Sequence, residues 1–264
     1  FGGAESKLKL IPADCLVKDN WMHKPLNWRG SKWVVKNFME IKSGKRIRIE
    51  NNLMTNNWAM AQEGTGIVFR TAEDSGKQAT LEDIEFINNI VKSSGSAVNL
   101  YGGEGMGARR ITIRNNLFMD INAAKYDGRG YFIKASDLDG VTIENNTVIH
   151  TGSITIAYGK PTKNLVFRNN IVFQNEYGFF GDGGTIGKGT FAKYFPGARV
   201  ERNIIVGASA SEYGRSNYYP SSIRQIGFSD FRDYQLRAES PYRTRGVGGK
   251  TVGADLDLKT VGGN

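Results

Sequence analysis

A short pattern of alternating apolar and polar residues recurs along the chain and ends each time at an asparagine. One copy is ITIRNNLF at 111–118, in which Ile111 and Ile113 alternate with Thr112 and Arg114. Alternation with a period of two is typical of a β-strand that buries one face. Seven copies align on their last asparagine, at Asn20, Asn52, Asn89, Asn116, Asn146, Asn170 and Asn203. A unit that recurs every few tens of residues predicts a solenoid, in which each coil buries the apolar face of its neighbour.

The asparagine column has a physical explanation of its own. Asparagine tolerates a left-handed bend between strands better than most residues. Its side-chain amide both donates and accepts, so stacked copies can form a hydrogen-bonded ladder along the axis of the solenoid. The outward residues just before the last four Asn-Asn or Arg-Asn pairs alternate in the sign of their charge: Arg114, Glu144, Arg168 and Glu201. We expect parallel stacking to set them side by side.

A second strand-like run follows most copies of the repeat. These runs are GTGIVFRT (64–71), SAVNLYG (96–102), GYFIKAS (130–136), SITIAYG (153–159) and YGFFGDG (177–183). Alternation along the runs turns Arg70, Asn99, Tyr101 and Lys134 outward, with Asp182 further along the chain. Because consecutive coils stack, we expect these side chains to form a polar strip along the axis.

The two ends of the chain differ in pattern. We assign residues 1–232 to the coils and residues 233–264, which are rich in glycine and charge, to an irregular C-terminal cap and tail of the same domain. A cap is needed where the last coil would otherwise expose the edge of a sheet. The first coil has no comparable cap in the sequence. We therefore expect an N-terminal extension or a partner to cover it.

Composition sets limits on the partners of the chain. The formal net charge of +9 favours acidic partners such as an anionic polysaccharide, although it is also consistent with simple solubility. The basic residues are scattered and form no stripe interleaved with aromatic residues, which argues against nucleic acid as a partner. The sequence holds no run of 18 apolar residues, so we predict no membrane span.

The loop at 20–33 gathers three of the four tryptophans beside cationic residues. Aromatic faces next to cations suit sugar stacking or anion binding, which would involve Trp28, Arg29 and Trp33. The alternative is an apolar flap packed over the side of the coil.

Metal ligands are sparse in the sequence. The two histidines, His23 and His150, lie too far apart to suggest a cluster, and we predict no cofactor. Aspartate pairs could supply oxygen atoms to Ca²⁺, but neither pair has the spacing of a known calcium motif. These pairs are Asp137 with Asp139 and Asp255 with Asp257.

The NN-containing repeats, each followed by a glycine-led strand, resemble the right-handed parallel β-helix superfamily of pectate lyases, polygalacturonases, alginate-modifying enzymes and phage tailspikes. The stretches at 23–52, 191–207 and 233–258 resemble secreted bacterial β-helix proteins without assigned function. The resemblance implies an all-β, right-handed parallel β-helix of about seven or more coils, and a secreted or cell-surface location. The catalytic motifs of the pectate lyases and the aspartate trio of the polygalacturonases are absent, so the resemblance supplies no mechanism.

Three functions follow as hypotheses. The first is an enzyme acting on an acidic polysaccharide by elimination or hydrolysis. Elimination needs a base, here Lys134 or Tyr101, and a cation that neutralises the sugar carboxylate, here Arg70; Asn99 and Asp182 would bind substrate. The second is a non-catalytic glycan-binding module that uses the tryptophan loop, and the third is a structural surface module.

Overall fold

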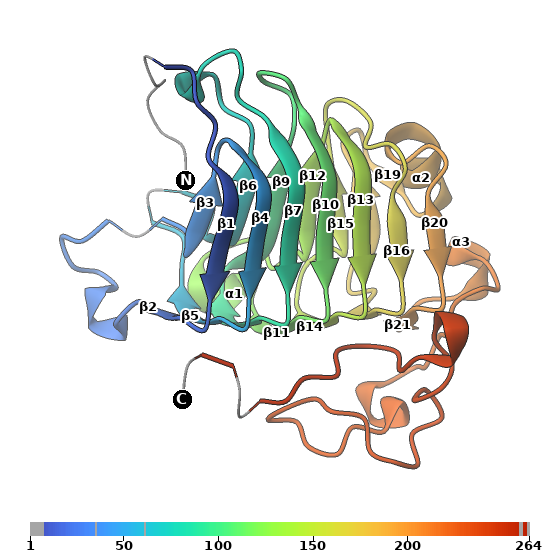
Figure 1. Cartoon of the computed structure of the whole chain (residues 1–264). Coiled ribbons are helices and arrows are strands. Elements are labelled where there is room, and N and C mark those ends of the chain that lie inside the picture. The colour runs from blue at the N-terminus through green and yellow to red at the C-terminus, as the bar shows by residue number, and fades with distance from the viewer. Residues whose placement is uncertain (1–7, 35, 61, 259–260, 263–264) are drawn as a thin grey trace.

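The computed structural model describes residues 8–34, 36–60, 62–258 and 261–262 and shows a solenoid of short, mostly parallel strands (Figure 1). The strands form three sheets of seven strands each, which we call sheets A, B and C. Sheet A contains β1 (Ala13–Lys18), β4 (Gly44–Glu50), β7 (Leu81–Ile87), β10 (Ala108–Arg114), β13 (Leu138–Glu144), β16 (Val166–Arg168) and β20 (Arg199–Glu201). Sheet B contains β2 (Trp21–His23), β5 (Leu53–Asn57), β8 (Ile90–Ser94), β11 (Leu117–Ile121), β14 (Thr147–His150), β17 (Ile171–Phe173) and β21 (Ile204–Val206). Sheet C contains β3 (Met39–Ile41), β6 (Thr65–Arg70), β9 (Ser96–Tyr101), β12 (Ile133–Ser136), β15 (Thr155–Ala157), β18 (Phe179–Gly181) and β19 (Thr185–Ile186).

This architecture confirms the predicted all-β solenoid. The repeats that end in asparagine form sheet A and the start of sheet B, and the second runs form sheet C. Among the described residues, three short α-helices stand outside the sheets: α1 (Ala123–Tyr126), α2 (Lys188–Tyr194) and α3 (Ala210–Tyr213). Within the described part of the chain, none of the helices has the length and apolarity that crossing a membrane requires.

The interior of the solenoid is filled by columns of inward side chains. The aligned residues Ile47, Ile84 and Ile111 are all fully buried, as the period-two pattern predicts. A column of phenylalanine rings runs through the coils with neighbouring ring centres 5.1–6.4 Å apart, through Phe69, Phe86, Phe118, Phe132, Phe167 and Phe179. Each coil therefore completes the core of the next.

The expected asparagine ladder is present. Asn116 Nδ2 donates to Asn146 Oδ1 at 3.0 Å and to the carbonyl of Phe86 at 2.8 Å. The same contacts join the aligned asparagines from Asn20 to Asn203. The ladder continues to an eighth member, Asn217, which accepts from Asn203 Nδ2 at 2.9 Å. Buried amides thus satisfy one another along the axis.

The left-handed bend lies one residue earlier than the sequence interpretation placed it. The residue before each of the first seven ladder asparagines, Asn20 to Asn203, has a φ between 53° and 57°, whereas these asparagines themselves do not have a left-handed φ. The first residue of the pair makes the bend, and the second can then point its amide into the coil wall. These bend residues are Asp19, Asn51, Asn88, Asn115, Asn145, Asn169 and Arg202.

The outer face of sheet A carries charges that pair with one another. The predicted register is confirmed, since Glu144 stands opposite both Arg114 and Arg168, and Arg168 stands opposite Glu201. Arg168 Nε lies 2.7 Å from a carboxylate oxygen of Glu144.

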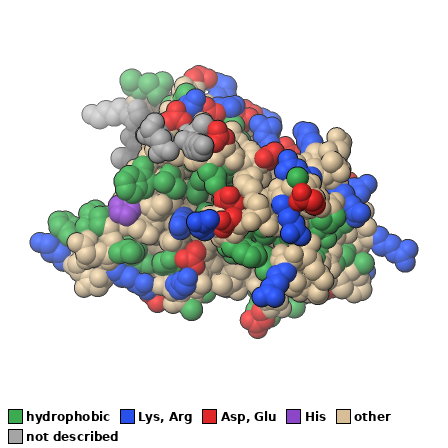
Figure 2. All heavy atoms as spheres, turned by 90° about the horizontal axis from the view of Figure 1, so that it is seen from below, with side chains coloured by type: hydrophobic (Ala, Val, Ile, Leu, Met, Phe, Trp, Pro, Cys, Tyr) green, Lys and Arg blue, Asp and Glu red, His purple; other side chains and the backbone are tan. Residues whose placement is uncertain are grey.

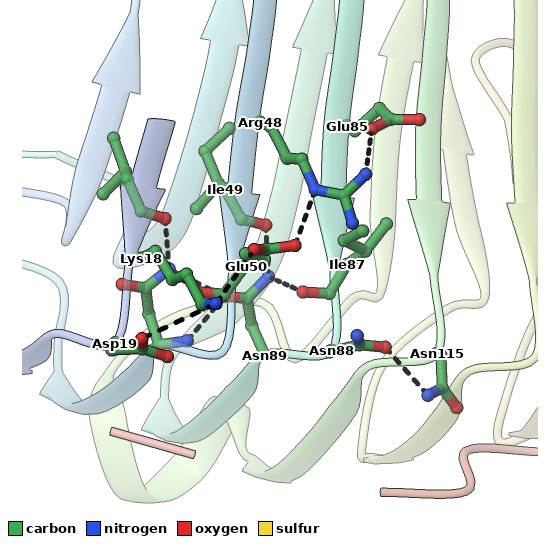
Figure 3. A network of polar contacts seen from close by, with 12 residues as sticks. Lys18, Asp19, Arg48, Ile49, Glu50, Glu85, Ile87, Asn88, Asn89 and Asn115 are labelled. Carbon is green, nitrogen blue, oxygen red and sulfur yellow. Dashed lines mark hydrogen bonds and ion pairs between the residues drawn. The ribbon is translucent and has the colours of Figure 1, made fainter. Parts of the chain in front are cut away.

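The pairing extends to the earlier coils of sheet A. Arg48 joins Glu50 at 2.6 Å and Glu85 at 3.0 Å, as Figure 3 shows. A hydrogen bond and ion pair with Arg48 lower the pKa of the Glu50 carboxyl. We infer that these charges fix the register of the sheet.

The C-terminal tail reaches further than a cap over the last coil. It runs back beneath the coils, beside sheet B (Figure 1). Val247 N donates to Asn169 Oδ1 at 2.8 Å, and Asp255 N donates to Asn115 Oδ1 at 2.7 Å. The asparagines that make the bends therefore also hold the tail.

Other segments cover the end of the last coil. The backbone of Tyr218 pairs with Ile204 beside β21, and Tyr194, Phe195 and Tyr213 from the α2 and α3 region pack into the main core. At the opposite end, β1, β2 and β3 are edge strands of the three sheets. The expected extension or partner at that end stays a prediction, and residues 1–7 lie outside the described residues.

Candidate functional site

A polar pocket of about 340 Å³ lies on the outer face of sheet C. Strands β6, β9 and β12 supply Arg70, Asn99 and Lys134 to it, three residues that alternation in the sequence turned outward. Asn99 stands opposite Lys134 in the register, and Arg70 stands opposite Tyr101. Parallel stacking therefore brings together residues that lie far apart in the sequence.

Both cations of the pocket are held by carboxylates. Lys134 Nζ donates to the two carboxylate oxygens of Glu63 at 2.9 and 2.8 Å, and Arg70 Nη2 lies 3.1 Å from Glu104 Oε1. Glu63 belongs to the loop before β6 and half of its side chain is exposed (51%), whereas only 16% of the Lys134 side chain is exposed. A ligand carboxylate would compete with Glu63 for the lysine.

Two tyrosine rings lie beside the cations Arg70 and Lys134. Tyr101 and Tyr158 lie nearly parallel, with ring centres 6.3 Å apart and planes inclined by 7°. Arg70 lies over Tyr101 at 5.7 Å, and Lys134 lies over Tyr158 at 5.4 Å. Burial, together with the charges of nearby acidic groups, raises the pKa of Tyr158 to about 12. Tyr158 is therefore a hydrogen-bond donor at neutral pH.

Two buried polar atoms in the pocket lack partners within the described part of the protein. They are Asn99 Oδ1, an acceptor, and Arg70 Nε, a donor. A buried polar group without a partner costs free energy, on the order of 1–3 kcal/mol. Such atoms beside an open pocket indicate a surface completed by a ligand or by water.

Asp182 lies at the far end of the same face. It follows β18, and its side chain is exposed. Its backbone carbonyl accepts a hydrogen bond from Tyr194 Oη at 2.9 Å, which fixes the loop. The carboxylate of Asp182 takes no part in that bond. Asp182 is not among the described residues that line the sheet C pocket.

The tryptophan loop is a separate part of the candidate surface. The Trp28 and Trp33 rings lie 6.1 Å apart and are 37% and 52% exposed, so they are not buried as a packed flap would be. Arg29 donates to the carbonyl of Lys125 at 2.7 Å and forms an ion pair with Asp127. Arg29 therefore anchors the loop near α1.

The loop that carries Glu63 is anchored at the same place. Ala59 N donates to the carbonyl of Tyr126 at 2.9 Å, at the end of α1. The two candidate regions, the tryptophan loop and the sheet C pocket, are thus joined through one short helix.

The aspartates considered for Ca²⁺ have other partners. Asp137 forms an ion pair with Lys160 at 3.1 Å, and Asp139 accepts from Asn164 at 2.6 Å. Asp255 binds Asn115 through its backbone. In the described ranges, no three His, Cys, Asp or Glu side chains gather as a metal ion would require.

Six residues that line the pocket were missed from the sequence: Glu40, Gln62, Glu63, Thr65, Val68 and Tyr158. Tyr158 could have been found, because alternation along 153–159 turns Ile156 and then Tyr158 outward. Glu63 could not, since a loop residue carries no periodic signal and the fold of the loop decides where it points.

Comparison with known proteins agrees with this architecture. A family described as "Right handed beta helix region" matches residues 40–224, more than half of the chain. The chain belongs to this family. No curated protein matches this β-helix chain, and no solved structure does. The predicted right-handed parallel β-helix is therefore confirmed, while the comparisons name no substrate.

Proposed function

We propose that this β-helix protein binds an extended acidic polysaccharide along the outer face of sheet C. Arg70 and Lys134 would contact sugar carboxylates, Asn99 would accept from a hydroxyl group, and Tyr101 with Tyr158 would stack on a sugar ring. The observation that carries the proposal is the pocket in which Arg70 Nε and Asn99 Oδ1 are buried without a partner in the described structure. A secreted or cell-surface location fits such a ligand.

The shape of the face supports an extended ligand. The outward row runs in register over the consecutive strands β3, β6, β9 and β12, through Glu40, Val68, Asn99 and Lys134. Neighbouring strands repeat about every 4.8 Å. Each sugar unit of a chain that lies along the axis would therefore face roughly one coil. Trp28 and Trp33, exposed near α1, would extend the contact beyond the pocket.

A panel of acidic and neutral glycans, measured by isothermal titration calorimetry, tests the proposal. We expect an acidic oligosaccharide to bind, and Lys134→Met to weaken binding about tenfold or more, since a charge-assisted contact is worth roughly 1.5–3 kcal/mol. The matched control is Lys92→Met, which removes an exposed lysine from sheet B. Equal binding by both variants would contradict the assignment, as would failure of every acidic glycan to bind.

A polysaccharide lyase or hydrolase is the second candidate. One observation favours it: two carboxylates, Glu40 and Glu63, line the same pocket as Lys134 and Tyr158. Pairs of carboxylates serve glycoside hydrolysis, and a lysine can serve elimination. Because Lys134 Nζ donates to Glu63, it would first have to leave that pair and lose a proton to act as a base.

The two candidates are separated by the products. Elimination gives an unsaturated sugar that absorbs in the ultraviolet, and hydrolysis gives new reducing ends without that absorbance. If the polysaccharide binds and neither product forms, the protein is a binding module. If Lys134→Ala retains full lyase activity, the assignment of Lys134 as base is wrong.

A further inference from the structure

A second polar pocket, of about 570 Å³, lies at the last coil. Arg202 follows β20, Tyr218 lies beside β21, and Arg245 lies within the C-terminal cap and tail. None of the residues that line this pocket also lines the pocket on sheet C. The site is therefore independent of the polysaccharide surface proposed above.

Two arginines of this pocket are arranged around one tyrosine ring. Arg202 Nη1 donates to Tyr218 Oη at 2.8 Å, and that hydroxyl donates to the carbonyl of Arg245 at 2.9 Å. The guanidinium of Arg245 lies over the Tyr218 ring, 5.8 Å from its centre. Tyr218 therefore orients one cation by a hydrogen bond and the other by its ring face.

In the part of the chain that the structure describes, no carboxylate lies within ion-pair distance of Arg202 or Arg245. This differs from sheet A, where Arg46 and Arg110 form ion pairs with Asp14 and Asp83 at 2.6 Å. Two cations gathered around one ring repel each other, and an anion between them would remove that repulsion.

Arg202 is also an exception in the column of bend residues. The six earlier positions hold asparagine or aspartate, which tolerate the left-handed backbone, and only the seventh of the column holds an arginine, at φ 56°. An arginine in this conformation is disfavoured locally. Arg46 (φ 51°) and Arg110 (φ 55°) share this backbone conformation on sheet A, where each is held by a carboxylate, whereas Arg202 forms no ion pair with a carboxylate of the described residues.

We propose that Arg202, Arg245 and Tyr218 bind an oxyanion: a sulfate, phosphate or carboxylate group. A guanidinium offers a planar fork of donors that fits such oxygens. Gly248 and Gly249, which also line the pocket, leave open space where a side chain would begin. Glu201 lines the pocket too. The part of the ligand beside it carries hydroxyl groups, because a carboxylate accepts hydrogen bonds from them. A sugar bearing one anionic group meets both conditions.

Titration of the full chain with sodium sulfate, sodium phosphate and sodium glucuronate at low ionic strength tests the proposal, and the three anions separate the possible sources. We expect saturable binding of at least one of them. Arg202→Asn and Arg245→Gln should each weaken it about tenfold or more. Glu201→Gln should strengthen the binding of inorganic anions, because it removes a repulsive charge.

Folding and charge effects are controlled separately. Arg202→Asn restores the residue type of the earlier coils, so its Tm should equal or exceed that of the parent protein. Arg114→Gln removes the same charge from an exposed position on β10 and should leave anion binding unchanged. The proposal is overturned if no anion binds saturably, if Arg202→Asn binds as the parent does, or if Arg114→Gln weakens binding equally.

Discussion

Sheets A and C are built by the same stacking of coils, yet their outer faces differ. On sheet A, the side chain of Glu82 is 10% exposed and has three cations within 3.4 Å, those of Lys45, Arg109 and Arg110. On sheet C, Asn99 Oδ1 and Arg70 Nε are buried without a partner in the described structure. A face whose polar groups satisfy one another holds the fold, whereas a face with unmet polar groups is available to a ligand.

Sheet B differs from both because the tail covers it. Leu117 packs with Ala254 and Leu256 of the tail, and Asn145 Nδ2 donates to the carbonyl of Thr251 at 2.7 Å. The face of the molecule seen from below, over which the tail runs, shows basic and acidic side chains interspersed with hydrophobic ones (Figure 2). The faces of sheets A and C are therefore the ones to compare.

The largest expected loss of stability follows from a substitution in the asparagine ladder, which supports every face of the solenoid. Asn116→Ala removes a fully buried amide, takes the side-chain acceptor away from Asn89 N and Nδ2, and leaves Asn146 Oδ1 with the backbone N–H of residue 116 alone. We expect a loss of about 3 to 5 kcal/mol in the free energy of unfolding, measured by urea denaturation. A loss below about 1 kcal/mol would contradict the view that the ladder supports the fold.

A substitution of Asn99 on sheet C gives the comparison for the ladder variant. Asn99→Leu removes an amide whose oxygen has no partner within the described residues, so stability should change little while glycan binding falls. If Asn99→Leu destabilised the protein as much as Asn116→Ala, the distinction between the two asparagines would be wrong.

The next effect concerns His150, buried at the end of β14. Its Nε2 accepts from the backbone N–H of Phe173 at 3.2 Å, and burial lowers its pKa to about 4. The unfolded chain takes up a proton near pH 6.5 and the folded protein does not, so stability is full above pH 6.5 and falls as the pH drops towards 4. We expect a loss of about 3 kcal/mol across this range. His150→Gln should flatten the profile in urea denaturation, and His23→Gln, at an exposed position, should not.

A smaller effect is expected on the charged face of sheet A. Glu82→Gln leaves Lys45, Arg109 and Arg110 without their shared partner. We expect a loss of about 1–2 kcal/mol in thermal denaturation, reduced at high salt, with glycan binding unchanged. Impaired glycan binding in this variant would show that the two faces are not independent.

The smallest effect on stability is expected at Glu63. Its ion pair with Lys134 is half exposed on the glutamate side. Glu63→Gln should change the free energy of unfolding by less than about 1 kcal/mol. It should also strengthen the binding of acidic glycans, because the internal carboxylate no longer competes for Lys134. Weaker binding would indicate that Glu63 itself contacts the glycan.

The site could be predicted only where its residues lie on strands. Alternation placed Arg70, Asn99 and Lys134 on one face, because a period of two fixes the side of a sheet on which each residue lies. The partners of the cations, Glu63 and Glu104, come from loops that have no such period.

The sequence by itself determined the coil, its core columns and the ladder from Asn20 to Asn203, because a repeat that buries its own neighbours carries this information locally. It did not show that Asn217 extends the ladder, since that asparagine lacks the flanking apolar pattern. Only the tertiary structure decided where the tail lies and which loop carboxylates meet the cations of sheet C. Those outcomes depend on contacts between residues distant in the chain, such as Asn115 with Asp255, for which no local pattern exists.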